Sequence, residues 1–400
     1  MNPYDDLYPN TEVPSFLWRS SSHQTIFSIA ALSRFFLFAF NKTEVHGLPR
    51  FLDLLKSRSD YQTRRKGLVT VSNHVSVLDD PLIWGVLPLS FAAFHGYMNH
   101  RWTFGSHDIC FTNAFRSNFF SLGQTLPTHR LAHSQHGGIA QPTMMEGVRL
   151  LTTIFARRPS WNPYIKRGLE KAEDFQLSWP HDCVDPFSDV SPAPAYPSCL
   201  KDERHYLAPS RYACNSYSWI HIFPEGMIHQ SPNRNMRYFK WGVARLILEP
   251  SECPDVVPMF IEGTDEIMHE ARQFPRFIPR IGKKVAVTFG REVDTEVVFG
   301  DLRKRWKEIR DEDYARSIHS PNASYPNEAV GLLTDTLLNG EEAIELRKEC
   351  TRRIRQEVLK VRRSRGYPDE DPKARLVETY LKEGPEREGR TKDGTYVKDI

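Results

Sequence analysis

The stretch Asn73-His74-Val75-Ser76-Val77-Leu78-Asp79-Asp80-Pro81 says more about the fold and chemistry of this chain than any other. It follows residues 67–72, an apolar run with the length and β-branched content of a buried strand. Histidine, with an ordinary pKa of about 6.5, accepts a proton near neutral pH, and a carboxylate on its other ring nitrogen would fix its tautomer. Residues five apart do not share a helix face. We therefore expect His74 in the turn after the strand and Asp79 in the first helical turn that follows.

A second motif lies much further along the chain, in Ile220-His221-Ile222-Phe223-Pro224-Glu225-Gly226. Here too an apolar strand runs into a tight turn, in which Pro224 fixes the backbone, Gly226 permits close approach and Glu225 lies at the rim. A histidine and an aspartate five residues apart arise by chance in a chain with 15 histidines, and alone they fit a local hydrogen bond at a helix start. The two motifs together are far more specific than either.

Together they resemble the glycerophospholipid acyltransferase superfamily, whose members pair an N-H-x-x-x-x-D block with an F-P-E-G block. Within it, the chain is most similar to the mitochondrial transacylases that move acyl chains between phospholipids and lysophospholipids. The likeness covers roughly residues 15–160, 217–295 and 340–365. Besides the two motifs, it rests on Trp84-Gly85, Asn118-Phe119-Phe120-Ser121-Leu122-Gly123 leading to Arg130, Phe239-Lys240-Trp241-Gly242-Val243-Ala244-Arg245-Leu246-Ile247 and Pro275-Arg276-Phe277.

The resemblance implies a catalytic pair formed by His74 and Asp79. His74 would take the proton from a lysophospholipid hydroxyl while that oxygen attacks an acyl ester, and Asp79 would orient the ring and stabilise its charge. This route needs no covalent acyl-enzyme, no metal and no cofactor. The acyl donor would be a second phospholipid, and the substrates would include cardiolipin.

The same resemblance suggests the substrate-binding residues. Arg130 is the candidate for the lipid phosphate, because a guanidinium pairs with phosphate oxygens in a fork, although its spacing from Gly123 is longer than in the usual glycine-to-arginine block. Asn73 or nearby backbone amides could stabilise the oxyanion. The remaining candidates form the second motif, with Glu225 expected to shape the glycerol or headgroup site: Phe223, Pro224, Glu225 and Gly226.

Three other functions stay open at this point. A serine hydrolase would use Ser76, which lies between His74 and Asp79, but the chain has no G-x-S-x-G elbow. A non-catalytic membrane-binding protein would account for the apolar and basic segments but not for both motifs. An acyl-CoA-dependent lysophospholipid acyltransferase shares both motifs. Against it, we find no glycine-rich phosphate loop, and the basic residues gather near the C-terminus rather than beside the histidine and aspartate.

Composition agrees with an α/β enzyme that carries irregular insertions. The chain is 40% apolar and 26% charged and contains 28 prolines. Its net charge of +3 gives no reason to expect a nucleic-acid partner. The six cysteines show no paired spacing, so neither a disulfide framework nor a zinc site is indicated.

Strands expected at 67–72, 218–223, 256–262 and 283–290 alternate with helices expected at 144–156, 237–248 and 341–365. This order predicts an α/β fold with a mixed sheet flanked by helices. The resemblance implies that this fold is acyltransferase-like and carries interfacial membrane helices. We expect these segments: 1–45 with an interfacial apolar helix, 46–300 as the acyltransferase domain with a proline-rich insertion at about 160–216, 301–340 as an insertion or linker, 341–365 as a basic amphipathic helix, and 366–400 as a charged, disordered tail.

Two apolar runs bear on membrane contact. Residues 25–40 would form a helix of only about 24 Å, shorter than a hydrocarbon core of about 30 Å, so we expect it to lie in the interface. Residues 81–94 fit either the protein core or a shallow insertion that carries the site to the lipid.

Charge also bears on the expected location. Between Arg347 and Arg365 nine Lys or Arg stand against two Glu, which fits either binding to anionic lipid or a solvated helix face. The first 16 residues carry three acidic residues and no Lys or Arg, the wrong sign for a signal or transit peptide. The resemblance implies a peripheral or monotopic protein on mitochondrial membranes facing the intermembrane space.

Overall fold

The computed structural model describes residues 13–94, 97–130, 137–153, 195–196, 206–207, 209–231, 233–318, 330–331 and 333–381. Most of the proline-rich insertion predicted at about 160–216 lies outside these residues. So do the two ends of the chain, 1–12 and 382–400.

One seven-stranded mixed sheet organises the described part of the chain, in the order β1-β9-β8-β2-β7-β3-β4. Neighbouring strands are parallel except β8 and β9, which pair antiparallel. The strands are β1 (Lys42–His46), β2 (Leu68–Val71), β3 (Arg101–Ser106), β4 (Thr125–Thr128), β7 (Trp219–Ile222), β8 (Asp255–Glu262) and β9 (Lys284–Phe289). A separate antiparallel pair is formed by β5 (Ala195–Tyr196) and β6 (Tyr206–Leu207).

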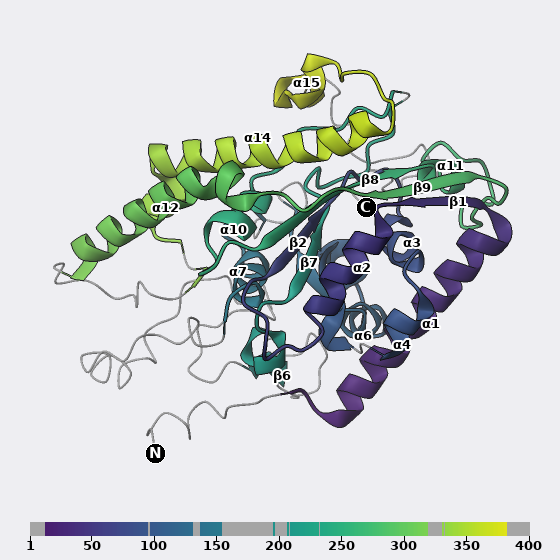
Figure 1. The fold of residues 1–400 in the computed structure, drawn as a ribbon, viewed down its shortest axis with the longest axis horizontal. Coiled ribbons are helices and arrows are strands. Elements are labelled where there is room, and N and C mark those ends of the chain that lie inside the picture. Colours follow the sequence, from purple (N-terminus) through teal and green to yellow (C-terminus); the bar gives the residue numbers. More distant parts are fainter. Residues whose placement is uncertain are drawn as a thin grey trace.

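Helices cover both faces of this sheet (Figure 1). On one side lie α7 (Pro142–Leu150), α10 (Gly242–Leu248), α12 (Thr295–Ile318), α13 (Asp335–Asn339) and α14 (Glu341–Ser364). On the other lie α1 (Phe16–Phe40), α2 (Leu48–Ser57), α3 (Asp79–Gly85) and α4 (Leu89–Phe94). Shorter elements are α5 (His107–Cys110), α6 (Ala114–Leu122), α11 (Thr264–Ile267) and α15 (Val377–Leu381), with 3₁₀ turns at Tyr97–Asn99, Pro209–Arg211, Ala213–Asn215 and η5 (Pro372–Arg375).

Side chains along the central strands point alternately to the two faces of the sheet, and each face carries its own layer of the hydrophobic core. Val69 and Val71 of β2 are fully buried in the cluster that includes α10 and α14. Leu68, on the same strand, is buried in the cluster that includes α2 and α3. Because a strand presents successive side chains to opposite faces, this fully buried strand contributes apolar side chains to both layers. The predicted α/β fold with a mixed sheet flanked by helices is therefore confirmed.

The N-terminal helix corrects one expectation from the sequence. α1 has 25 residues, about 38 Å at 1.5 Å per residue, so it is long and apolar enough by length and composition to cross a bilayer. The shorter helix expected at 25–40 was wrong, because Ser15 caps a helix that begins well before the apolar run. α1 packs along α3, α4 and α6. Arg34 donates to the carbonyls of Val86 and Leu87 at 3.1 and 3.2 Å.

The second apolar run, 81–94, belongs to the core. Leu82, Ile83 and Phe91 are at most 5% exposed, so their surface is already taken up by the protein. That burial favours the core interpretation over a shallow membrane insertion.

The C-terminal region is more ordered than expected. α14 lies close to the limits predicted from its charges and apolar stripe, and it packs on α10, α12 and β8. The disordered tail expected from residue 366 is wrong for residues 366–381, which continue into η5 and α15. The expected domain boundary at residue 300 falls inside α12.

Gly263, which joins β8 to α11, provides a test of this fold. Its φ is +85°, and a Cβ built there would lie 1.8 Å from the carbonyl oxygen of Lys284. Gly282 has a similar φ of +76° but open space around it. Gly282→Ala should therefore destabilise the fold by about 1 kcal/mol, from backbone strain alone. Gly263→Ala should destabilise it by more than about 3 kcal/mol, because β9 must also shift. Chemical denaturation measures both, and equal losses would contradict this account.

Candidate active site

The two residues of the first motif meet as the sequence predicts. His74 follows β2, Asp79 is the first residue of α3, and His74 Nδ1 lies 2.9 Å from Asp79 Oδ2. An ionised carboxylate only accepts hydrogen bonds, so this contact places the proton on Nδ1 and leaves Nε2 as the basic nitrogen.

Asp79 is fully buried and accepts from several donors. Its Oδ2 receives the backbone N–H groups of Val75 at 2.6 Å and Ser76 at 2.9 Å, and its Oδ1 receives the hydroxyl of Thr264. These donors surround the carboxylate with its preferred partners, so the charge is compensated without water. Thr264, from α11, is a supporting residue that the sequence did not reveal.

Glu225 holds the second motif against the first. Its Oε1 accepts the backbone N–H of His74 at 2.8 Å, and its Oε2 accepts that of Arg237 at 2.7 Å. Burial raises the pKa of Glu225 to about 7, against the lowering effect of these two bonds. Both carboxylate oxygens are thus engaged inside the protein. Glu225 therefore positions His74, instead of lining a headgroup site as expected.

One aromatic ring packs on His74, and a second histidine lies against that ring. Phe223 stacks on the His74 ring with centroids 4.4 Å apart, and it meets His221 edge-on at 4.5 Å. His221 is fully buried between the hydroxyls of Thr70 and Ser72, at 2.9 and 3.2 Å. Burial lowers the pKa of His221 to about 3, so this second histidine is neutral near pH 7. It was not identified from the sequence and acts as packing beneath the site.

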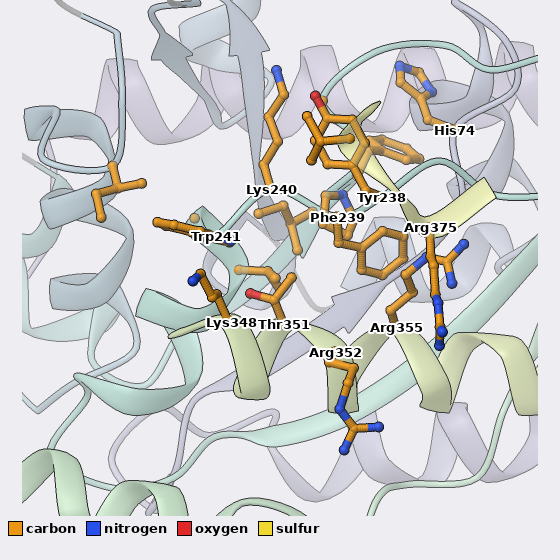
Figure 2. A pocket seen from close by; sticks show the side chains of 18 of the residues that line it. His74, Tyr238, Phe239, Lys240, Trp241, Lys348, Thr351, Arg352, Arg355 and Arg375 are labelled. Carbon is orange, nitrogen blue, oxygen red and sulfur yellow. The ribbon is translucent and has the colours of Figure 1, made fainter. Parts of the chain in front are cut away.

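A cavity of about 1110 Å³ opens beside His74. Figure 2 shows His74 on one of its walls, with Tyr238, Phe239, Lys240 and Trp241 on another and side chains of α14 on a third. The residues of the second motif that line it are Phe223, Pro224 and Gly226. Gly226 has a φ of +68°, and a Cβ there would lie 2.7 Å from the side chain of Lys240. The turn therefore requires glycine at this position.

Arg130 lines the same cavity but already has an acidic partner. Its Nε lies 3.3 Å from Asp108 Oδ1, and its Nη2 contacts Asp108 Oδ2. Burial opposes the ionised form of Asp108, but hydrogen bonds from Arg130 and Ser106 outweigh it and keep the pKa of this carboxyl below its ordinary value. A phosphate at Arg130 would therefore have to displace Asp108 or use another edge of the guanidinium.

Two candidate residues lie away from the cavity. Asn73 is buried and exchanges two hydrogen bonds with the backbone of Ile261, at 2.8 and 2.9 Å, so its amide ties β2 to β8 instead of facing an oxyanion. Ser76 is fully buried, and its hydroxyl accepts from Leu78 N at 3.4 Å. Neither is among the residues that line the cavity. The position of Ser76 argues against a serine hydrolase.

The basic helix lies where the sequence did not place it. Lys348, Arg352, Arg355 and Arg363 of α14 line the cavity beside His74, and the first three are labelled in Figure 2. The expectation that the basic residues gather away from the histidine and aspartate was therefore wrong. No group of three or more His, Cys, Asp or Glu is arranged to hold a metal ion within the described ranges.

Comparison with known proteins agrees with this fold. The family model described as Acyltransferase matches residues 53–262, and the chain belongs to this acyltransferase family. Within the family it is one of the tafazzins. It is 33% identical to tafazzin of Saccharomyces cerevisiae over 376 residues, which cover 92% of the chain and 84% of that protein.

Two further relatives are more distant. Tafazzin of Drosophila melanogaster is 28% identical over 307 residues, 76% of the chain and 60% of the fly protein. N-acylphosphatidylethanolamine synthase of Arabidopsis thaliana is 26% identical over 279 residues, 68% of the chain and 70% of the plant protein. The chain is thus an acyltransferase enzyme.

Replacing either member of the pair should abolish acyl transfer. We expect His74→Ala and Asp79→Asn each to lower turnover by at least about a thousandfold, because the first removes the base and the second removes its orienting charge. Circular dichroism and a lipid-exchange assay on the purified variants test this. Ser76→Ala is the matched control inside the same turn and should keep most of the activity. Full activity in either of the first two variants would exclude the mechanism. A folded but inactive Ser76→Ala variant would instead support the serine hydrolase function.

Proposed function

We propose that the protein is a CoA-independent transacylase that moves acyl chains between phospholipids and lysophospholipids, including cardiolipin. His74 takes the proton from the free hydroxyl of the lysophospholipid as that oxygen attacks the donor ester. The same proton then passes to the departing glycerol oxygen, so the enzyme ends as it began. The resemblance to tafazzins supports cardiolipin remodelling on mitochondrial membranes, with the protein facing the intermembrane space.

The observation that carries this proposal is the hydrogen bond between His74 and Asp79 at the wall of the cavity. It makes Nε2 the basic nitrogen of a ring that lines the cavity. Ser76 is buried away from the cavity, which supports direct transfer between two lipids without a serine acyl-enzyme.

Acyl-CoA-dependent transfer is the second candidate, and one observation favours it. Among the described residues, seven Lys or Arg and two carboxylates line the cavity, namely Arg130, Lys240, Lys348, Arg352, Arg355, Arg363 and Arg375 against Asp369 and Glu370. A basic cavity suits the phosphates of CoA as well as those of lipids. The two functions therefore differ in the donor and share the base.

Membrane contact is proposed at the edge of the sheet that carries His74. The carboxyl ends of β2 and β8 lie at this edge because the two strands are parallel. The loop after β8 exposes four large apolar residues there: Phe274, Phe277, Ile278 and Ile281. The end of α1 joins them, since Gly282 N donates to Phe40 O at 2.8 Å and both Phe38 and Phe40 are exposed.

Gln230 links the same loop to the turn that carries His74. Gln230 donates to Val75 O at 2.8 Å and accepts from Glu270 N at 3.1 Å. An exposed apolar patch next to a site is typical of a membrane-contact surface. Because α1 packs on α3, α4 and α6, we propose a monotopic arrangement in which α1 stays with the domain.

Removing two rings of this loop should weaken membrane binding. Phe274 and Phe277 are 87% and 75% exposed, and burying each in the interface would stabilise the bound state by about 1.5–3 kcal/mol. The double variant Phe274→Ser/Phe277→Ser should therefore bind phosphatidylcholine vesicles at least about tenfold more weakly in co-sedimentation. Val297→Ser, at an equally exposed apolar position on α12, is the control and should bind normally. Unchanged binding by the double variant would place the membrane contact elsewhere.

The donor decides between the two functions. Exchange between two glycerol esters is nearly isoenergetic, so it needs neither a thioester nor a metal. We expect purified protein to move label from phosphatidylcholine to lysocardiolipin with CoA rigorously removed and a chelator present, and to move it back when the label starts in cardiolipin. Thin-layer or mass-spectrometric analysis of the lipids follows both directions. Transfer that occurs only with acyl-CoA would establish the second candidate.

A further inference from the structure

The cationic side chains that line the cavity beside His74 come from separate parts of the chain, and Lys240 belongs to the segment after the second motif. Arg130 follows β4. A further group is formed by α14 and η5: Lys348, Arg352, Arg363 and Arg375. Figure 2 labels Lys348, Arg352 and Arg375 of this group. This group is far from both sequence motifs along the chain.

Most of these cations have partners inside the protein. Arg355 is buried and binds the carbonyls of Met236 and Arg237 together with Glu370, so it serves the fold. Lys348, Arg352 and Arg363 are about half exposed and pair with acidic neighbours on α14 and the segment after it: Glu345, Glu349 and Asp369. Such exposed pairs contribute little to stability and exchange easily with a ligand.

Arg375 differs from all of them. It is exposed on the cavity wall, and its guanidinium forms no hydrogen bond or ion pair within the part of the chain that the structure describes. Gln356 on α14 lines the same cavity and is likewise exposed, with its side-chain amide unpaired among the described residues. Both side chains therefore have free N–H donors toward the cavity.

The α14 wall is regular. Lys348, Arg352, Gln356, Leu359 and Arg363 line the cavity at spacings of three or four residues, as one helix face requires. This face extends for about 22 Å at 1.5 Å per residue. The cavity of about 1110 Å³ also exceeds the roughly 300–1,000 Å³ that accommodate one drug-sized ligand. It therefore has room for the polar parts of two substrates.

Direct acyl transfer requires two substrates in the site at the same moment, and each of them carries a phosphate. We propose that Arg375, with Gln356 of the α14 wall, binds the phosphate group of the second substrate. This inference rests on the proposed function only for the identity of the second substrate, a phospholipid in place of acyl-CoA. A phosphodiester of a phospholipid and a phosphate of acyl-CoA offer the same oxygens to a guanidinium and an amide.

The test compares Arg375→Gln with Lys373→Gln, a matched control on the same 3₁₀ turn whose side chain is exposed but does not line the cavity. Initial rates are measured on neutral phosphatidylcholine vesicles, which limits general charge effects. Three series vary the donor phospholipid without CoA, the acceptor lysophospholipid without CoA, and acyl-CoA. We expect Arg375→Gln to raise one half-saturating concentration about tenfold, with the maximal rate within about twofold. Lys373→Gln should match the wild type.

The series in which the half-saturating concentration rises identifies the source of the phosphate. A rise in the donor or acceptor lipid series indicates a lipid phosphate, and a rise in the acyl-CoA series indicates a phosphate of CoA. Unchanged half-saturation in all three series would overturn the site. So would an equal effect of Lys373→Gln, which would indicate surface charge alone. If the wild type transfers only from acyl-CoA, the transacylase function fails, but the third series still tests Arg375.

Discussion

The buried carboxylate of Asp79 is the constraint on which the rest of the site depends. An ionised carboxylate without partners in the interior would be strongly destabilising, so the fold must bring donors to it. Two come from the backbone of Val75 and Ser76, one from the ring of His74 and one from the hydroxyl of Thr264. The turn after β2 consequently has a single satisfactory shape, and that shape orients the His74 ring.

A chain of contacts extends this constraint to the C-terminal helix. The backbone N–H of His74 binds Glu225, and Glu225 also binds the backbone N–H of Arg237. The carbonyl of Arg237 accepts from Arg355 of α14. Further along α14, Arg362 donates to the carbonyls of Asn233 and Arg234 at 2.7 and 2.9 Å. Arg355 and Arg362 of α14 thus hold the segment after the second motif, and the exposed Arg352 and Arg363 line the cavity.

The sequence predicted the local features of this protein well. β2, β7, β8 and β9 are apolar runs with clear limits, and the bond between His74 and Asp79 spans one turn, so both were within reach of pattern analysis. β1 was not predicted, because Lys-Thr-Glu-Val-His is a polar strand at the sheet edge whose pairing with β9 is decided by tertiary contacts. The roles of Asn73 and Glu225 were misjudged for a related reason. Their partners, Ile261 and Arg237, are distant in sequence or have no signal of their own.

The cavity itself could not be predicted from the sequence. Its basic wall is separated from His74 by more of the chain than local periodicity can connect, so the charges on α14 were interpreted as fitting either anionic lipid or a solvated helix face, and not as part of the site. The N-terminal helix was underestimated because polar residues before its apolar run concealed its start. In both cases the local composition was interpreted correctly, but tertiary packing decided where the α14 charges lie and which elements α1 contacts.

The central claim is that Asp79 holds His74 with its proton on Nδ1 and its basic Nε2 toward the cavity. Long-range ¹H–¹⁵N correlation spectra of histidine-labelled protein near pH 8 test this directly, with His74 assigned by the loss of its signals in His74→Gln. The account predicts a protonated Nδ1 and an unprotonated Nε2 for His74. In Thr264→Val, which removes one donor to Asp79, this tautomer should become mixed. A wild-type His74 protonated on Nε2, or a rapidly averaged ring, would contradict the account.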